Sequence, residues 1–273
     1  MSVNRGRTLL SLLIPASLTE ETADPRIKTY KVGQVARAAS IFRVDEIVVY
    51  KTPKRDDSRF ISTVLRYAET PQYLRKEIFP MQGALRHIGV IPPLRIPSHT
   101  VKEEEEYREG IVTKVGTDGN AWVDVGSDSP AMLPDAKVKK GQRVTVRIYS
   151  RRPLTVELVK RSDVPLYWGY EVRIVDTLHD ALETDGLRIA TSRLGQPLTF
   201  EMLSEIKSKI RDKVSVAFGS PSKGLEQLLH DEGHKLEDNS DCVVNSIPNQ
   251  GTATVRAEEA IYVTLGLLNL IRQ

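Results

Sequence analysis

Residues 243–261, "VVNSIPNQGTATVRAEEAI", are the most informative segment for the fold. A short apolar run ends in a loop of Pro, Asn, Gln, Gly and small hydroxyl residues. A helical pattern then opens with Arg256, Glu258 and Glu259 and continues as an apolar segment. A buried strand that leads through such a loop into a buried helix predicts an α/β fold in which the loop is available to bind a ligand.

Size and composition bound the possibilities. The chain has 273 residues, which is room for a large domain and a small one at roughly 100–200 residues each. A hydrophobic content of 40% and a charged content of 27% are typical of a soluble globular protein rather than a disordered one. The single cysteine, Cys242, excludes an internal disulfide and a Cys-rich zinc site, and it favours a reducing, cytoplasmic setting.

The N-terminal run "TLLSLLIPASL", which follows Arg5 and Arg7, faintly resembles a signal peptide. However, it is short, it is broken by Pro15, and the polar segment "TEETADP" follows it. These features favour a first buried strand. No run reaches the roughly 18 apolar residues of a membrane span, so we expect no membrane association.

The rest of the N-terminal part also has α/β character. The segment "DEIVVY" predicts a second buried strand, and "IKTYKVGQVARAASIF" predicts a helix that begins near Asp24 and Pro25. A further helical region is expected over about 58–78, interrupted at Pro71.

The C-terminal part returns to the same pattern from "YWGYEV" onward. Strands are predicted in "LRIATSR", "VSVAFG" and "DCVVNSIP", and helices in "PLTFEMLSEIKSKIRDK", "SKGLEQLL" and about 254–271. Pro197 suits the first turn of the first of these helices. The last helix is apolar on more than one face, which predicts burial on several sides or an interface.

The middle of the chain follows a period of two from about Glu105 to Lys160. The segments "GIVTKV", "AWVDVG", "QRVTVRIY" and "LTVELV" alternate between turn residues, which predicts a small β-barrel. The acidic run 103–106 is expected to be a solvated connection. Because 1–90 offers too few strands for its own sheet, we expect a discontinuous α/β domain (1–91 and 166–273) with the barrel (92–165) inserted.

Three loops are expected at the carboxyl ends of parallel strands, where such sheets bind ligands. They are "ATSR" (190–193), "FGSPSKG" (218–224) and "NSIPNQGTAT" (245–254). One loop of this composition is ordinary for an α/β protein, and it is the coincidence of three that favours a site. Neither G-x-G-x-x-G nor a P-loop occurs. "HDEGH" (230–234) carries Asp231 where a metalloprotease needs Glu, so we expect no metal site.

Basic residues gather between Lys137 and Arg161, where nine Lys or Arg face one acid, Glu157. A solvated sheet face and a phosphate-binding surface both remain open for this cluster. The candidate RNA contacts are Lys139, Lys140, Arg143, Arg147, Arg151 and Arg152.

Three segments, "VAFGSPSKGL", "VVNSIPNQGTATVRAEEAI" and "IKTYKVGQVARAASIF", resemble the SPOUT class of S-adenosylmethionine-dependent RNA methyltransferases; "TPQYLRKEIFP" and "YWGYEV" add to the match. The resemblance spans nearly the whole chain and implies an α/β parallel sheet with a C-terminal trefoil knot. It points to the archaeal and eukaryotic branch with an inserted oligonucleotide-binding-type barrel. That branch is linked to uridine N3 methylation of large-subunit ribosomal RNA.

The resemblance also implies the cofactor, the site residues and a homodimer. S-adenosylmethionine is expected to contact Thr191, Arg193, Gly219, Asn245, Ser246, Ile247, Gly251, Thr252 and Thr254. Catalytic candidates are Arg37, which in family dimers can reach the partner's site, together with Arg256 and Glu258. Helix capping by Thr254 and dipole compensation by Glu258 are the structural alternatives. No general base can be identified from these residues.

Rival functions stay open at this point. One is a non-catalytic RNA-binding protein with a vestigial α/β domain, and another is a methyltransferase that acts on tRNA. A third is an α/β enzyme with a different nucleotide cofactor, which the absence of Rossmann and P-loop signatures disfavours.

Overall fold

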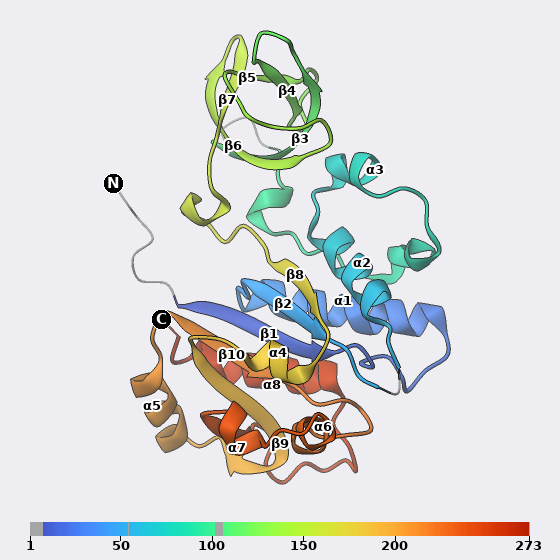
Figure 1. The fold of residues 1–273 in the computed structure, drawn as a ribbon, viewed down its shortest axis with the longest axis vertical. Coiled ribbons are helices and arrows are strands. Elements are labelled where there is room, and N and C mark those ends of the chain that lie inside the picture. The colour runs from blue at the N-terminus through green and yellow to red at the C-terminus, as the bar shows by residue number, and fades with distance from the viewer. Residues whose placement is uncertain (1–7, 54, 102–105, 273) are drawn as a thin grey trace. The chain divides into compact units, whose positions relative to one another are not determined.

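The protein, seen here as a computed structural model, is described over residues 8–53, 55–101 and 106–272 (Figure 1). It divides into two compact units. The larger unit takes in residues 8–68, 84–94 and 170–272, and the smaller one takes in 69–83 and 95–169. Most of the acidic run expected to be a solvated connection, residues 103–105, lies outside the described ranges.

A six-stranded sheet forms the centre of the larger unit, in the order β11-β9-β10-β1-β2-β8. Every neighbouring pair is parallel, which confirms the predicted joining of the first 90 residues with the C-terminal part. The strands are β1 (Leu9–Pro15), β2 (Glu46–Tyr50), β8 (Glu171–Val175), β9 (Leu187–Pro197), β10 (Lys213–Ala217) and β11 (Cys242–Asn245).

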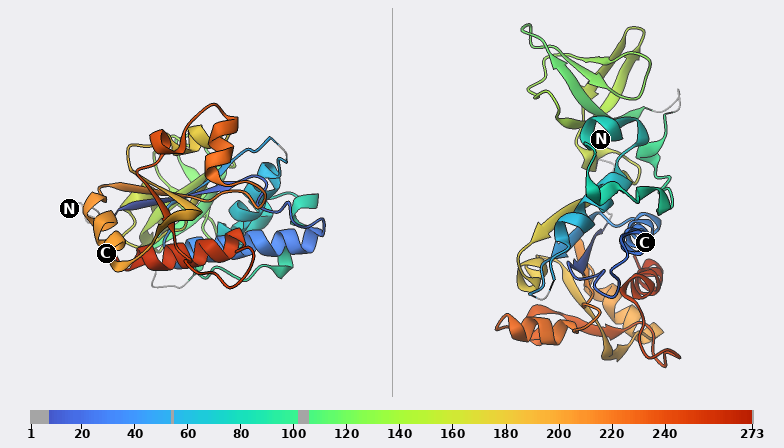
Figure 2. Two further views of the ribbon diagram at one scale, coloured as in Figure 1. Left: turned by 90° about the horizontal axis from the view of Figure 1, so that it is seen from below. Right: turned by 90° about the vertical axis from the view of Figure 1, so that its right-hand side faces the viewer.

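Helices cover both faces of this sheet. Figure 2 shows α1 and α8 together on one face, with α4 and α6 on the other. The helices of this unit are α1 (Pro25–Ile41), α2 (Ser58–Glu69), α4 (Leu178–Leu182), α5 (Phe200–Lys209), α6 (Leu225–Asp231), α7 (Leu236–Asn239) and α8 (Ala257–Asn269), and α3 (Arg75–Ile78) belongs to the smaller unit. None of the helices described is long and apolar enough to cross a membrane.

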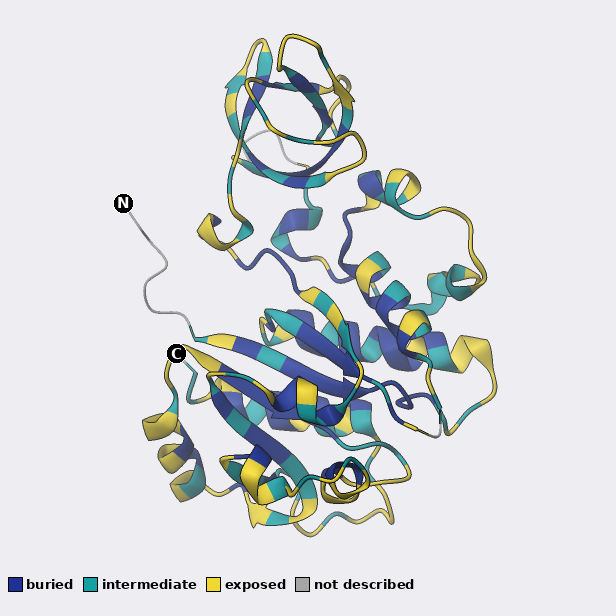
Figure 3. Cartoon of the chain, in the orientation of Figure 1, coloured by how far each residue is buried: buried dark blue, intermediate teal, exposed yellow. Residues whose placement is uncertain are grey.

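Burial from both sides explains why the central strands read as continuous apolar runs. Leu12, Leu13 and Ile14 of β1 have no exposed surface, although successive residues of a strand point to alternate faces. Most of β1 is drawn as buried in Figure 3. Each such side chain contributes about 1.5–3 kcal/mol to folding through its removal from water. The strands whose carboxyl ends carry the three loops therefore belong to a sheet with a well-packed core.

The start of α1 follows the sequence prediction, whereas the start of α5 does not. Pro25 is the first residue of α1, and the Asp24 carboxylate accepts a hydrogen bond of 2.8 Å from the Arg26 amide. Pro197, expected in the first turn of α5, instead ends β9, and Thr199 caps the helix. The placement was wrong because the strand runs longer than its apolar residues indicate.

The smaller unit contains a closed five-stranded barrel in the order β3-β4-β5-β7-β6. Its strands are β3 (Tyr107–Val115), β4 (Ala121–Asp124), β5 (Ala131–Leu133), β6 (Arg143–Arg151) and β7 (Leu154–Leu158). The barrel is confirmed, but β5 was missed because three residues between turns carry almost no periodic signal. Val112, Val123, Val144 and Val146 are among the inward-facing residues that fill it.

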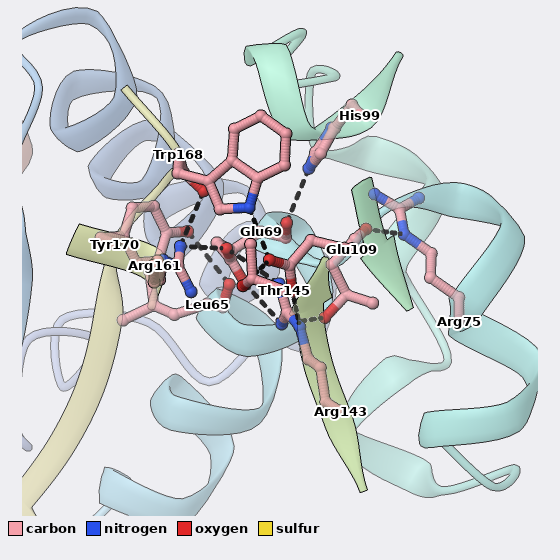
Figure 4. A network of polar contacts seen from close by, with 11 residues as sticks. Leu65, Glu69, Arg75, His99, Glu109, Arg143, Thr145, Arg161, Trp168 and Tyr170 are labelled. Carbon is pink, nitrogen blue, oxygen red and sulfur yellow. Dashed lines mark hydrogen bonds and ion pairs between the residues drawn. The ribbon is translucent and has the colours of Figure 1, made fainter. Parts of the chain in front are cut away.

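A buried polar network lies in the same unit (Figure 4). The Arg143 guanidinium pairs with Glu69 at 2.8 Å and with Glu109 at 2.5 Å, and Arg161 also pairs with Glu69. The indole of Trp168 donates to Glu109 at 2.5 Å. Burial works against the charged form of Glu69, but the two guanidinium groups outweigh it and lower its pKa. The network is a structural feature of this unit.

Candidate functional site

A cavity of about 450 Å³ opens at the carboxyl ends of β9, β10 and β11. The three loops predicted from the sequence all contribute to its wall. Eight of the twelve predicted cofactor and catalytic residues line it, namely Thr191, Arg193, Gly219, Asn245, Ser246, Ile247, Thr254 and Arg256. Gly251, Thr252, Arg37 and Glu258 do not.

An irregularity in the sheet creates part of this cavity. The register between β11 and β9 jumps at Val243 and Val244, from partner Ala190 to partner Gln196. Residues 191–195 therefore have no ladder partner on β11, and 191–194 line the cavity. Gly195 allows the chain to return, because a Cβ there would lie 2.7 Å from the carbonyl carbon of Val244.

Asn245 joins two of the loops. Its Nδ2 donates a 2.8 Å hydrogen bond to the carbonyl oxygen of Arg193, and its Oδ1 accepts one of 3.0 Å from the amide of Ile247. Thr191 makes a similar link, since its hydroxyl donates to the carbonyl oxygen of Ala217 at 2.8 Å. These side chains shape the cavity by fixing main chain.

The two predicted glycines differ in role. A Cβ on Gly219 would lie 3.0 Å from the carbonyl oxygen of Lys223, so this position needs glycine for the close turn of its own loop. A Cβ on Gly251 would meet no atom within 4 Å. Of these two positions, only 219 is therefore too crowded for a side chain.

The first turn of α8 borders the cavity. Arg256 is the N-cap residue, and its amide donates a 2.9 Å hydrogen bond to the Glu259 carboxylate. Capping by Thr254 is thus wrong, because the helix begins too late for it. The hydroxyl of Thr252 donates to the carbonyl oxygen of Thr254 at 3.0 Å, which orders the loop.

A charged triplet lies beside the cavity. Lys31 of α1 is almost fully buried, it forms an ion pair with Glu21, and its Nζ lies 3.6 Å from Oε2 of Glu258. Glu258 is therefore a partner of Lys31 and has no surface on the cavity. Glu21 does line it. Glu21 could not be predicted from the sequence, because it belongs to a polar loop without periodicity.

Arg37 is held away from the cavity of its own chain. Its Nη1 donates to the carbonyl oxygens of Pro93 at 3.2 Å and Leu94 at 2.9 Å. Within the described residues it thus fixes the 93–94 segment.

The predicted RNA contacts fall into two groups. Lys139, Lys140, Arg151 and Arg152 are exposed on the barrel unit. Arg143 belongs to the buried network, and Arg147 pairs with Glu106 and Glu157 on the barrel surface. A phosphate would have to compete with carboxylates at Arg143 and Arg147, so the exposed group fits that task better.

The histidines of "HDEGH" form no metal site with their neighbours. The ring of His234 stacks on His179 at 3.8 Å between centroids. Across residues 8–53, 55–101 and 106–272, no group of three His, Cys, Asp or Glu side chains is arranged to hold a metal ion. Cys242 is half-buried, and burial raises the pKa of its thiol to about 11.

Comparisons with known proteins agree with this geometry. A family model described as "Putative RNA methyltransferase" matches residues 9–268. An uncharacterized protein of Halobacterium salinarum is 43% identical over 95% of this chain and 98% of its own. A mouse protein named 28S rRNA (uridine-N(3))-methyltransferase is 34% identical over 97% of this chain and 77% of its own.

A solved structure gives a much weaker likeness. The SpoU methyltransferase AviRb from Streptomyces viridochromogenes, crystallised with AdoMet, aligns with 99% of this chain and 61% of its own. Its TM-score is 0.38 and its identity 10%, values too low to carry an argument.

Proposed function

The chain belongs to the RNA methyltransferase family whose model spans residues 9–268, and from that premise we propose that it methylates N3 of a uridine in large-subunit ribosomal RNA. The observation that carries the proposal is the cavity formed by three strand-end loops. The name of the 34% identical mouse relative supports the target atom and the RNA class.

S-adenosylmethionine is the proposed methyl donor, and the cavity suits it. Its volume of about 450 Å³ lies within the roughly 300–1,000 Å³ typical of small-ligand sites. Leu194, Phe218 and Ile247 offer apolar surface for a purine, and Ser192 and Gln250 offer hydrogen-bonding groups for the ribose and the amino-acid part. The donor supplies an electrophilic methyl carbon when it is bound.

The chain's own residues have three tasks in this reaction. They must hold donor and base in line, accept the N3 proton and stabilise the negative charge that develops on the pyrimidine oxygens. Arg256 borders the cavity with an exposed guanidinium and suits the third task. Arg37 is proposed to act in the site of a second copy of the chain.

RNA is proposed to bind the barrel unit. Lys139, Lys140 and Arg152 are exposed, and none of them forms an ion pair with another described residue. Tyr149 lies at a bulge of β6 and exposes 76% of its surface, so its ring is free to stack on an unpaired base. Phosphate contacts and stacking together favour a single-stranded or looped target.

A homodimer, a trefoil knot and a cytoplasmic location complete the proposal. Exposed apolar side chains on α1 and α8, among them Tyr30, Ile41 and Val263, support an interface on that face. The knotted path is proposed from the likeness of residues 243–261 to the SPOUT class. We also propose that residues 1–91 and 166–273 act as the methyltransferase domain and that the inserted residues 92–165 act as the RNA-binding domain.

The direct test is methyl transfer to ribosomal RNA. The purified protein is incubated with isotopically labelled S-adenosylmethionine and unmodified large-subunit ribosomal RNA, and the nucleosides are analysed by mass spectrometry. Labelled 3-methyluridine is the expected product. Label in tRNA alone would transfer the activity to that RNA class, and cofactor binding without labelled RNA would favour a non-catalytic RNA-binding protein.

A further inference from the structure

A second cavity adjoins the first in the larger unit. It has a volume of about 370 Å³ and is lined by Glu20, Glu21, Arg55, Pro221 and Ser222. Three of these residues, Glu21, Pro221 and Ser222, also line the first cavity. The two cavities therefore share a wall, and among the described residues Glu21 is its only ionisable side chain.

Resting on the proposed function, we propose that the second cavity receives the target uracil and that Glu21 accepts its N3 proton. Uracil presents an N3–H donor between two carbonyl oxygens. A carboxylate complements the donor, and the Arg55 guanidinium complements a carbonyl oxygen. Glu20 also lines this cavity, and its Oε1 has no hydrogen-bond partner among the described residues.

The charged groups of this cavity are held in place from behind. Nε of Arg55 donates to Asp57 at 2.9 Å, and the same carboxylate oxygen accepts from the Thr19 hydroxyl at 2.8 Å and from Lys28 at 3.1 Å. Burial opposes the charge of Asp57, but these partners outweigh it and keep its pKa low. Arg55 thus has a fixed anionic support and keeps 37% of its side-chain surface exposed.

Glu21 has a corresponding support on the other side. Its carboxylate pairs with Lys31, whose side chain is only 7% exposed and which also faces Glu258. This triplet gives Glu258 a positioning role. Glu21 thus borders both the cofactor cavity and the second cavity. The residue that accepts the N3 proton must lie where the donor and the base meet, and Glu21 has this position.

The N3–H bond breaks, its proton passes to a carboxylate oxygen of Glu21, and N3 keeps the electron pair. N3 uses that pair for its bond to the methyl carbon, while the bond from this carbon to the donor's sulfur would break and leave its electron pair on sulfur, so that the demethylated donor is the leaving group. Arg55 stabilises the charge that gathers on the neighbouring carbonyl oxygen.

Photocrosslinking tests the location without any need for turnover. A short oligouridylate that carries one 4-thiouridine is irradiated with the full-length protein and saturating S-adenosylhomocysteine, and the linked peptides are mapped by mass spectrometry. Crosslinks within residues 16–24, 51–57 or 219–224 are expected, and Arg55→Met should reduce their yield at least about fivefold while cofactor affinity is kept. Crosslinks confined to other segments, or an unchanged yield in the variant, would overturn the assignment.

Glu21→Gln tests the base. The variant should bind S-adenosylhomocysteine and form the crosslink like wild type, and should lose about 10²–10⁴-fold in single-turnover rate. Its rate should climb steeply between about pH 6 and 8, because ionised uridine is now required, whereas wild type should change little. Thermal unfolding checks the fold, and Glu205→Gln removes an exposed carboxylate from an ion pair with Lys209 as the matched control.

A Glu21→Gln rate and pH profile equal to wild type would contradict the role of Glu21. If the wild-type protein did not bind the cofactor at all, that result would contradict the proposed function itself, and it is distinct from a failure of the Glu21 assignment.

Discussion

Nδ2 of Asn245 donates a hydrogen bond of 2.8 Å to the carbonyl oxygen of Arg193, which fixes the loop after β11 against the unpaired segment of β9. The same side chain accepts from the amide of Ile247. One residue therefore sets the shape of the cavity from inside its wall, without needing to touch a ligand.

Asn245→Ala should weaken S-adenosylhomocysteine binding. Two hydrogen bonds of about 0.5–1.5 kcal/mol each hold the loops, so a loss of about 5- to 150-fold in affinity is expected. Isothermal titration calorimetry measures it. Asn269→Ala, at the exposed end of α8, is the control and should bind like wild type; equal affinities for the two variants would contradict this view of the loops.

The two glycines should respond differently to alanine. Gly219→Ala places a Cβ 3.0 Å from the Lys223 carbonyl oxygen, so we expect a cost of about 1–3 kcal/mol in stability together with weaker cofactor binding. Gly251→Ala meets no neighbour within 4 Å and should change neither property. Thermal unfolding and calorimetry of the pair check this, and a large effect at Gly251 would show that the open loop closes on the ligand.

Charge reversal at Lys139, Lys140, Arg151 and Arg152 should weaken RNA binding and flatten its salt dependence. Each lost phosphate contact should lower the slope of log affinity against log salt by about 0.7–0.9. Fluorescence anisotropy with a ribosomal RNA fragment over several salt concentrations measures the slope. Lys207→Glu, exposed on α5, is the control. Slopes that match wild type would mean that the barrel cluster is only a solvated face.

Glu69→Gln should destabilise the protein at neutral pH by about 3–5 kcal/mol, since Arg143 and Arg161 lose a buried anionic partner. The folded pKa of Glu69 is lowered, so its contribution is present above the ordinary glutamate pKa and is lost as pH falls through the folded value. The stability difference between variant and wild type should therefore shrink in acid. Urea unfolding at several pH values tests this, and a difference independent of pH would contradict it.

Arg37→Ala should lower turnover and leave RNA affinity nearly intact if Arg37 serves a second copy of the chain. Mixing it with Asn245→Ala under conditions of subunit exchange, at a cofactor concentration too low to load the Asn245→Ala sites, should restore about a quarter of wild-type activity. Half of the dimers are then mixed, and one of their two sites is complete. Mixtures no more active than their components, or a monomer of about 30.6 kDa by sedimentation, would count against the shared site.

Sequence reasoning succeeded where a residue's role depends on its neighbours along the chain. The N-terminal end of α1 at Pro25 followed from Asp24, and the position of the cavity followed from three strand ends. It failed where the role depends on distant partners. In the sequence, Arg143 looks like one more basic residue on a strand, but in the structure its guanidinium forms ion pairs with Glu69 and Glu109.

Glu21 illustrates the same limit at the site itself. Its loop "TEETADP" has no periodicity and no motif, and only the folded chain brings it to the wall between two cavities. The jump in register at Val243 is equally invisible in the sequence, because both sides of it read as one apolar run.

Calorimetric titration of the protein with S-adenosylmethionine, followed by a crystal structure of the complex, decides whether the three-loop cavity is the cofactor site. We expect one cofactor per chain, bound between the loops that carry Arg193, Gly219 and Asn245. Absence of binding at millimolar cofactor, or density for the cofactor outside this cavity, would show that the cavity is not the cofactor site.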